Sequence, residues 1–327
     1  MWQYKPVLYL LLFLLVDKVL LVPQIQDRFT AIGSQKFDIF AIQNEAEIAD
    51  HRKKQIWVFG SSRSVPFMSV PTEEDIQANT VLTATQKQQL LQYQKFSLSL
   101  PGSTPVTYLH HYLYLTEKGY RPDMVWIEVS PFALNENYSF RRIFLNVLAP
   151  NRFMATHLSK YPLRMIAEWL YGLVFTGAVY PPVHQDRATQ NAVNFLNPIV
   201  RMRLSFQHRY GFTTITERDK KMATIPDAKV DSKYHQFLHT LYTKPFLNNF
   251  KIDPVSIDSL LLLVAKLRSD NVPFVIWNPP VHPNMTFLYD EAGVADPYYQ
   301  VMTELAGQDF FDISIDDMNC RYFSDDS

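Results

Sequence analysis

Gln55-Ile-Trp-Val-Phe-Gly-Ser-Ser-Arg-Ser64 is a short apolar run that ends in a glycine and a group of hydroxyl side chains. Ile56 to Phe59 have high strand propensity, and Gly60 permits a sharp change of backbone direction. In open α/β sheets, ligands bind beyond the carboxyl ends of the strands. The sequence therefore predicts a buried strand followed by a turn that presents a serine, positioned for nucleophilic attack, at the ligand-binding edge of a sheet.

Strand and helix patterns alternate along the rest of the chain. Strands are predicted at 56–59, 96–100, 124–129, 273–277 and 310–313, and helices at 84–95, 105–118, 257–268 and 297–306. The second helix has clear boundaries, because Thr104 is a good N-cap, Pro105 suits the first helical position and Gly119 supplies a stop. Five strands that alternate with helices predict an α/β fold with a doubly wound, mostly parallel five-stranded sheet of the flavodoxin-like kind.

Composition restricts the function classes. The 327 residues are 47% hydrophobic and include 31 basic and 32 acidic side chains, as expected of a globular chain with no strong net charge. We expect no nucleic-acid partner, since phosphate binding needs a concentrated basic surface. Cys320 is the only cysteine, which excludes an internal disulfide framework and cysteine-rich metal sites. No cofactor and no metal are predicted, because no histidine spacing indicates zinc.

The N-terminus carries an apolar run from Val7 to Val22 that Asp17 and Lys18 interrupt. At 1.5 Å per residue a helix there would be roughly 24 Å long, slightly less than a bilayer core. Tyr4 and a snorkelling Lys18 would extend its reach. We favour an uncleaved transmembrane helix, with residues 1–27 as the anchor, over a cleaved signal peptide or a core helix. The main domain, residues 28–327, is then expected on the extracytoplasmic side of a single-pass membrane protein.

A long helical insertion separates the third predicted strand from the helix at 257–268. Residues 138–250 hold 15 basic and 6 acidic side chains, a net charge of +9 that leaves −10 for the remaining chain. The insertion is also rich in aromatic residues. Such a surface would suit anionic lipid headgroups or an anionic glycan, although a solvated helical lid with its own small core explains the pattern at least as well.

The Gly60-Ser61-Ser62 turn resembles that of the SGNH (GDSL-like) hydrolase superfamily, in which a serine nucleophile follows the first strand in a Gly-Asp-Ser turn. Ser62 matches the nucleophile, and Ser61 replaces the aspartate. The chain looks most similar to the membrane-anchored branch of the superfamily, the DltD-like and alginate-acetylation proteins. The resemblance covers the α/β core, about 54–132 and 257–327, and leaves the insertion unexplained.

The remaining motifs of this superfamily have partial counterparts. Gly102, just before a predicted helix N-terminus, matches the oxyanion glycine, and the Arg63 backbone N–H would be the second donor. The family's asparagine has only a loose counterpart in Asn135. Asp325 matches the aspartate of the Asp-x-x-His motif, but the sequence stops at Ser327, one residue before that histidine.

Other titratable residues are weaker candidates. His282 follows the fourth predicted strand and is a possible alternative base, although its proline-rich loop is often merely structural. His110 and His111 are expected to be one core and one surface residue of their helix. Glu128, the one acid in the third strand, is expected to be a hydrogen-bonded structural carboxylate.

Together these features predict a membrane-anchored serine esterase or O-acyltransferase that acts on acyl esters of an envelope glycan or lipid. Activity is expected to be impaired in this chain for lack of the catalytic histidine. Its expected partners are membrane lipid, through the N-terminal helix, and an anionic glycan or an acyl-donor membrane protein. The alternative is a non-catalytic extracytoplasmic glycan-binding or scaffold protein that keeps the same fold.

Overall fold

The structure is a computed structural model, and it describes residues 5–19, 22, 53–61, 64, 73–78, 82–99, 102–137, 151–176, 247, 249–279, 289–307 and 310–312. The chain divides into two compact units. The first combines Met1–Ala46 with Ser139–Arg209, and the second combines Glu47–Tyr138 with Tyr210–Ser327.

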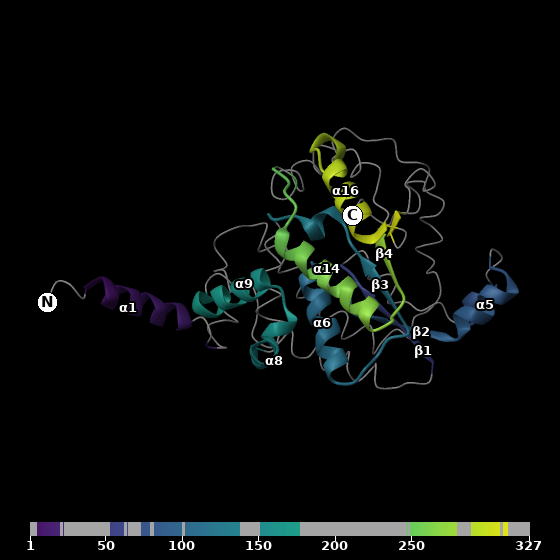
Figure 1. Cartoon of the computed structure of the whole chain (residues 1–327), viewed down its shortest axis with the longest axis horizontal. Coiled ribbons are helices and arrows are strands. Elements are labelled where there is room, and N and C mark those ends of the chain that lie inside the picture. The colour runs from purple at the N-terminus through teal and green to yellow at the C-terminus, as the bar shows by residue number, and fades with distance from the viewer. Residues whose placement is uncertain are drawn as a thin grey trace. The chain divides into compact units, whose positions relative to one another are not determined.

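A parallel sheet forms the centre of the second unit. Its strands are β1 (Lys54–Phe59), β2 (Tyr93–Ser97), β3 (Met124–Glu128), β4 (Phe274–Asn278) and β5 (Phe310–Asp312), in the order β2-β1-β3-β4-β5. Every pair of neighbours is parallel. Parallel neighbours require crossover connections, and the chain supplies helices for them (Figure 1). The predicted α/β class with a parallel sheet is confirmed.

The second strand begins earlier than the sequence pattern indicated. A strand was predicted at 96–100 after a helix at 84–95, whereas α5 is Ala84–Leu91 and β2 already begins at Tyr93. The reason is register, because Tyr93 pairs with Lys54 at the start of β1. Thr83 caps α5 through a capping box. The first three residues of β2, Tyr93 to Lys95, are half-buried, as is usual for an edge strand, so the apolar pattern there is weak.

Two long helices pack together beside the sheet, α6 (Pro105–Glu117) and α14 (Pro254–Ser269) (Figure 1). Each has proline in its first turn, and the Asp253 side chain caps α14. Each ends in a Schellman motif: Gly119 and Asn271 have positive φ, and the next residue donates back to a carbonyl five residues earlier. The predicted start and stop of the first of these helices are therefore confirmed.

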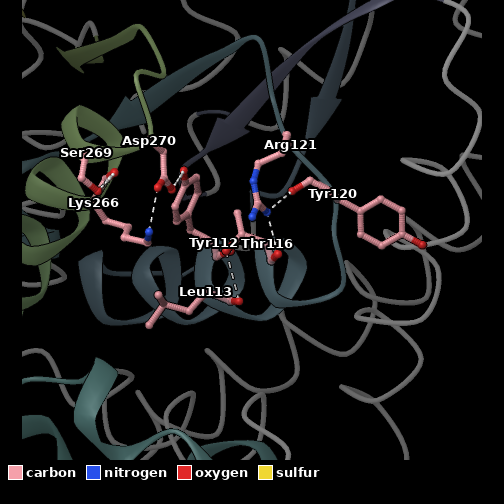
Figure 2. A network of polar contacts seen from close by, with 8 residues as sticks. All are labelled: Tyr112, Leu113, Thr116, Tyr120, Arg121, Lys266, Ser269 and Asp270. Atoms are coloured by element: carbon pink, nitrogen blue, oxygen red, sulfur yellow. Dashed lines mark hydrogen bonds and ion pairs between the residues drawn. The ribbon is translucent and has the colours of Figure 1, made fainter.

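A polar network joins the C-terminal ends of these two helices (Figure 2). The Tyr112 hydroxyl of α6 donates to the Asp270 carboxylate at 2.8 Å, and Lys266 donates to the same carboxylate at 2.7 Å. Burial works to raise the pKa of Asp270, but these hydrogen bonds and the positive charges of Lys266 and Arg121 together lower the pKa overall. Arg121 donates to the Thr116 carbonyl in the last turn of α6 at 2.6 Å, and this carbonyl also accepts from the Gly119 N–H at 3.1 Å.

The last helix of this unit, α16 (Ala295–Ala306), packs near the end of β3. The Tyr298 hydroxyl donates to the Val129 carbonyl at 2.6 Å. The helix begins two residues before the predicted 297–306, so Asp296 lies inside its first turn and Val294 occupies the N-cap position. Gly307 follows the helix with φ 52°. A 3-10 turn, η3 (Pro131–Leu134), follows β3 and contacts α16.

The first unit contains α1 (Lys5–Val19), α8 (Asn151–Thr156), η4 (Leu158–Lys160) and α9 (Leu163–Val174). Its buried apolar side chains include Met154, Tyr161, Met165 and Trp169. Among the described residues, no helix combines the length and the hydropathy needed to cross a bilayer. The predicted transmembrane helix therefore stays a prediction.

Candidate active site

A buried carboxylate holds the turn at the end of β1. Glu128, the last residue of β3, is fully buried next to that turn. It accepts hydrogen bonds from the Ser61 backbone N–H at 2.9 Å, from the Ser61 hydroxyl at 2.5 Å and from the Ser64 hydroxyl at 2.5 Å. The Ser64 N–H closes the turn on the Ser61 carbonyl at 3.2 Å. The carboxylate therefore fixes both ends of the Ser61–Ser64 turn.

Position 60 has no room for a side chain, so it requires glycine. A Cβ built at this position would lie 2.1 Å from Ser64 Oγ and 2.7 Å from Glu128 Oε2. Contacts of that length do not occur, so the side chains that form the clamp would have to move apart. The sequence assigned Gly60 to a sharp turn, and the structure adds that its missing side chain lets the carboxylate approach the turn.

The loop after β2 lies beside the same turn. The Leu98 N–H and the Ser99 hydroxyl both donate to the Val58 carbonyl of β1, at 2.7 Å and 3.3 Å. The Phe59 ring stacks on Tyr108 in the first half of α6, with ring centroids 6.0 Å apart. Gly102, with φ 80°, is in this loop just before α6. Gly102 therefore lies in the chain between β2, which pairs with β1, and α6, whose Tyr108 stacks on the last residue of β1.

Three buried hydroxyls cluster in sequence at the start of α6. Ser103, Thr104 and Thr107 are each 3% exposed or less. Their side-chain oxygens have no hydrogen-bond partner among the residues that the structure describes. The N-cap prediction for Thr104 is thus correct in position, but its side chain makes no capping hydrogen bond. Hydroxyl donors at a helix N-terminus are suited to an acceptor or an anion.

The opposite side of the edge is formed by β3 and β4. Asn278 ends β4 and is 7% exposed, a buried amide at the carboxyl edge that sequence reasoning missed. Asn135, the loose counterpart of the family asparagine, lies elsewhere: its Oδ1 accepts from the Asn137 N–H at 2.9 Å, and its backbone pairs with Ile252. Asn135 therefore stabilises a turn between segments.

The histidines of α6 differ from the prediction, because both are buried. His110 is 3% exposed and His111 is 5% exposed, since this helix is covered on nearly every side. Burial, with a smaller contribution from His111, lowers the pKa of His110 to about 3. Both are core residues of α6. In the described ranges no three His, Cys, Asp or Glu side chains are grouped as metal ligands.

Four of the site residues predicted from the sequence, Ser62, Arg63, His282 and Asp325, lie outside the described residues. Of the predicted set, the structure places Gly102, together with the neighbours of Ser62 at positions 60, 61 and 64. It adds Glu128 as the residue that holds the turn. A signal for Glu128 exists in the sequence, since a lone carboxylate at the end of a buried parallel strand must find donors.

The fold and this edge define an α/β protein with a parallel sheet and a glycine-serine turn held by a buried glutamate. Residues 1–327 match the family described as protein of unknown function (DUF1574), and the chain belongs to that family. No curated protein matches it.

Proposed function

We propose that this chain is a doubly wound, SGNH-like serine esterase or O-acyltransferase that acts on acyl esters of an envelope glycan or lipid. The observation that carries the proposal is the Ser61–Ser64 turn clamped by Glu128 at the carboxyl end of β1. Nucleophilic serines need a rigid, exposed turn, because the attacking oxygen must be held near the reacting carbonyl.

Ser62 is the proposed nucleophile. The hydroxyls of Ser61 and Ser64 both donate to Glu128, so their protons are committed to the carboxylate. Ser62, which lies between them in the sequence, is therefore the serine favoured as the nucleophile. In the proposed reaction, Ser62 Oγ bonds to the acyl carbonyl carbon while a base takes its proton. The carbonyl oxygen becomes an oxyanion, and the departing alcohol then receives the proton from the base.

The oxyanion would be held by the backbone N–H groups of Gly102 and Arg63, aided by the N-terminus of α6. Gly102 is favoured for this role by its positive φ and by the tie between its loop and β1. His282, in the segment that follows β4, is the base candidate within the chain, and Asp325 is the residue proposed to orient a base. A water molecule or a second alcohol then gives its proton to the base and bonds to the acyl carbon. The bond to Ser62 Oγ breaks, Ser62 takes the proton back from the base, and the acyl group leaves as a carboxylic acid or as a new ester.

The N-terminal helix is proposed to attach the protein to a membrane as a single-pass anchor, with the main domain on the extracytoplasmic side. The apolar exposure of α1 supports this, since Val7 to Phe13 are each more than half exposed. A hydrolase fixed to a membrane would meet substrates that are lipids or that extend from the membrane surface.

Hydrolysis of p-nitrophenyl acetate by the full chain in detergent tests the activity. We expect Ser62→Ala to abolish turnover, and the exposed Ser269→Ala on α14 to leave it unchanged. Equal turnover in Ser62→Ala and wild type would contradict the assignment. No turnover by a wild-type chain with a cooperative thermal transition would favour the non-catalytic glycan-binding alternative.

A further inference from the structure

The charged pair that interrupts the apolar helix α1 joins this helix to α9. Lys18 Nζ donates to the last carbonyls of α9, Leu173 O at 2.8 Å and Val174 O at 2.7 Å, and to Thr176 Oγ1 at 2.8 Å. The Asp17 carboxylate accepts from the Thr176 backbone N–H at 2.6 Å. Both helices belong to the first unit, and Figure 1 shows their ends meeting.

This contact supplies a hydrogen-bond donor to backbone carbonyls at the C-terminal end of α9. The last four carbonyls of a helix lack partners within it, and a lysine ammonium there also meets the negative end of the helix dipole. Asp17 is buried, although it lies in a helix whose other residues are mostly exposed. The two charges therefore have a specific role, which is to fix the C-terminal end of α1 to the C-terminal end of α9.

The surface around this junction is apolar and exposed. On α1, exposed apolar side chains occupy every position from Val7 to Phe13, about two full helical turns, so they point in all directions around the axis. On α9, Leu163 at the start of the helix is 84% exposed, and four further exposed apolar residues lie next to the junction: Leu170 at 48%, Tyr171 at 48%, Leu173 at 37% and Val174 at 46%. Soluble surfaces rarely expose contiguous apolar patches of this kind.

A bilayer is the occupant that fits this surface. A protein partner or a second copy covers one or two faces of a helix, whereas lipid surrounds it, and α1 is apolar on every side. Charge also favours a lipid surface. The described part of this unit has a net charge of +3, from the basic residues Lys5, Lys18, Arg152, Lys160 and Arg164 and the acidic residues Asp17 and Glu168. Anionic headgroups attract such a surface.

We infer that α1 and the C-terminal half of α9 form one lipid-embedded element, held together by the Asp17–Lys18 pair. The inference rests on the proposed membrane attachment and extends it to a second helix. At 15 residues α1 is roughly 22 Å long, short of the roughly 30 Å hydrocarbon core. The junction with α9 then lies within the lipid or at its boundary, where amphipathic helices bind by their apolar face.

Fluorescence quenching in proteoliposomes tests this. In a Cys320→Ser background, single cysteines at Leu12, Leu170 or Leu261 are labelled with nitrobenzoxadiazole. The chain is then reconstituted into phosphatidylcholine with a minority of phosphatidylglycerol, with or without doxyl-labelled lipid. Leu261 on α14, 47% exposed, is the matched control for Leu170 at 48%. We expect comparable loss of emission at positions 12 and 170, and none above background at 261.

Each other outcome has a definite meaning. Quenching at 12 without quenching at 170 overturns the role of α9 and leaves the anchor intact. Absence of quenching at both positions overturns the anchor as well. It does not decide the proposed esterase activity, which the turnover assay tests separately. Labels shielded from water without lipid quenching would show a protein occupant and would also overturn the inference.

A second variant tests the junction itself. Lys18→Ala is expected to reduce quenching at position 170 toward the level at 261 while leaving position 12 unchanged, because α9 loses its attachment to α1. Lys5→Ala, at the other end of α1, is the control and should change neither position. Undiminished quenching at 170 in Lys18→Ala would refute the role of the charged pair.

Discussion

Replacing Glu128 is the perturbation that bears most directly on the candidate site. Glu128→Ala removes the acceptor for three hydrogen bonds. Two of the donors, the Ser61 N–H and the buried Ser64 hydroxyl, would lose their partner away from water, at about 1–3 kcal/mol each. The half-exposed Ser61 hydroxyl regains water, and the cost of burying a carboxylate disappears. The expected loss of unfolding free energy is therefore about 3 kcal/mol.

Thermal unfolding followed by circular dichroism measures this loss. With an unfolding entropy of about 2.1 cal/mol/K per residue, a loss of about 3 kcal/mol lowers Tm by about 4 °C for a chain of 327 residues. Glu128→Gln keeps one acceptor oxygen and should lose about half as much free energy. The control is Glu136→Gln, because Glu136 is exposed in the same unit, and its effect should stay within about 0.5 kcal/mol. A Glu128→Ala protein within about 1 kcal/mol of the wild type would refute the clamp.

Three further predictions concern residues near this edge. Gly60→Ala places a Cβ 2.1 Å from Ser64 Oγ and should cost about 1–3 kcal/mol in urea unfolding; an unchanged midpoint would contradict the close approach. Thr107→Val removes a buried hydroxyl that has no partner among the described residues, so Tm should stay constant or rise. A decrease of more than about 1 kcal/mol in the free energy of unfolding would show that this hydroxyl has a partner. His110 has its pKa lowered to about 3 in the folded state from 6.5, so it contributes stability above pH 6.5 that is lost as the pH falls toward 3. A His110→Gln variant should remove a slope of about 1.4 kcal/mol per pH unit in that window, and parallel stability profiles would refute the shift.

The fold followed from the sequence where burial made the pattern strong. The strands near 56–59, 124–129 and 273–277 are central and apolar, and they were predicted to within one or two residues of β1, β3 and β4. The start of the edge strand β2 was misplaced because its first three residues are only half-buried, so pairing with β1 sets that start more than hydrophobicity does. Proline and glycine signals predicted the ends of α6 well, since they act locally.

The site was less predictable because its parts are distant in the sequence. Gly60 and Gly102 could be assigned to the ligand-binding edge, since each follows a predicted strand. The clamp could not, because Glu128 meets Ser61 across 67 positions and only if β1 and β3 are neighbours in the sheet. The same holds for Lys18, whose contacts on α9 lie more than 150 positions away. The sequence indicated that Glu128 needs hydrogen-bond donors, but tertiary pairing of this kind leaves no local pattern that shows which residues supply them.

The most direct test of the proposed function is to identify the residue that a fluorophosphonate modifies. The full chain is treated with the probe in detergent, digested, and analysed by peptide mass spectrometry, with heat-unfolded protein as the background. We predict one adduct, on Ser62, that is absent from the Ser62→Ala variant and from unfolded protein. An adduct on Ser61 or Ser64, or a folded protein that acquires none, would contradict the assignment of this turn as the nucleophile.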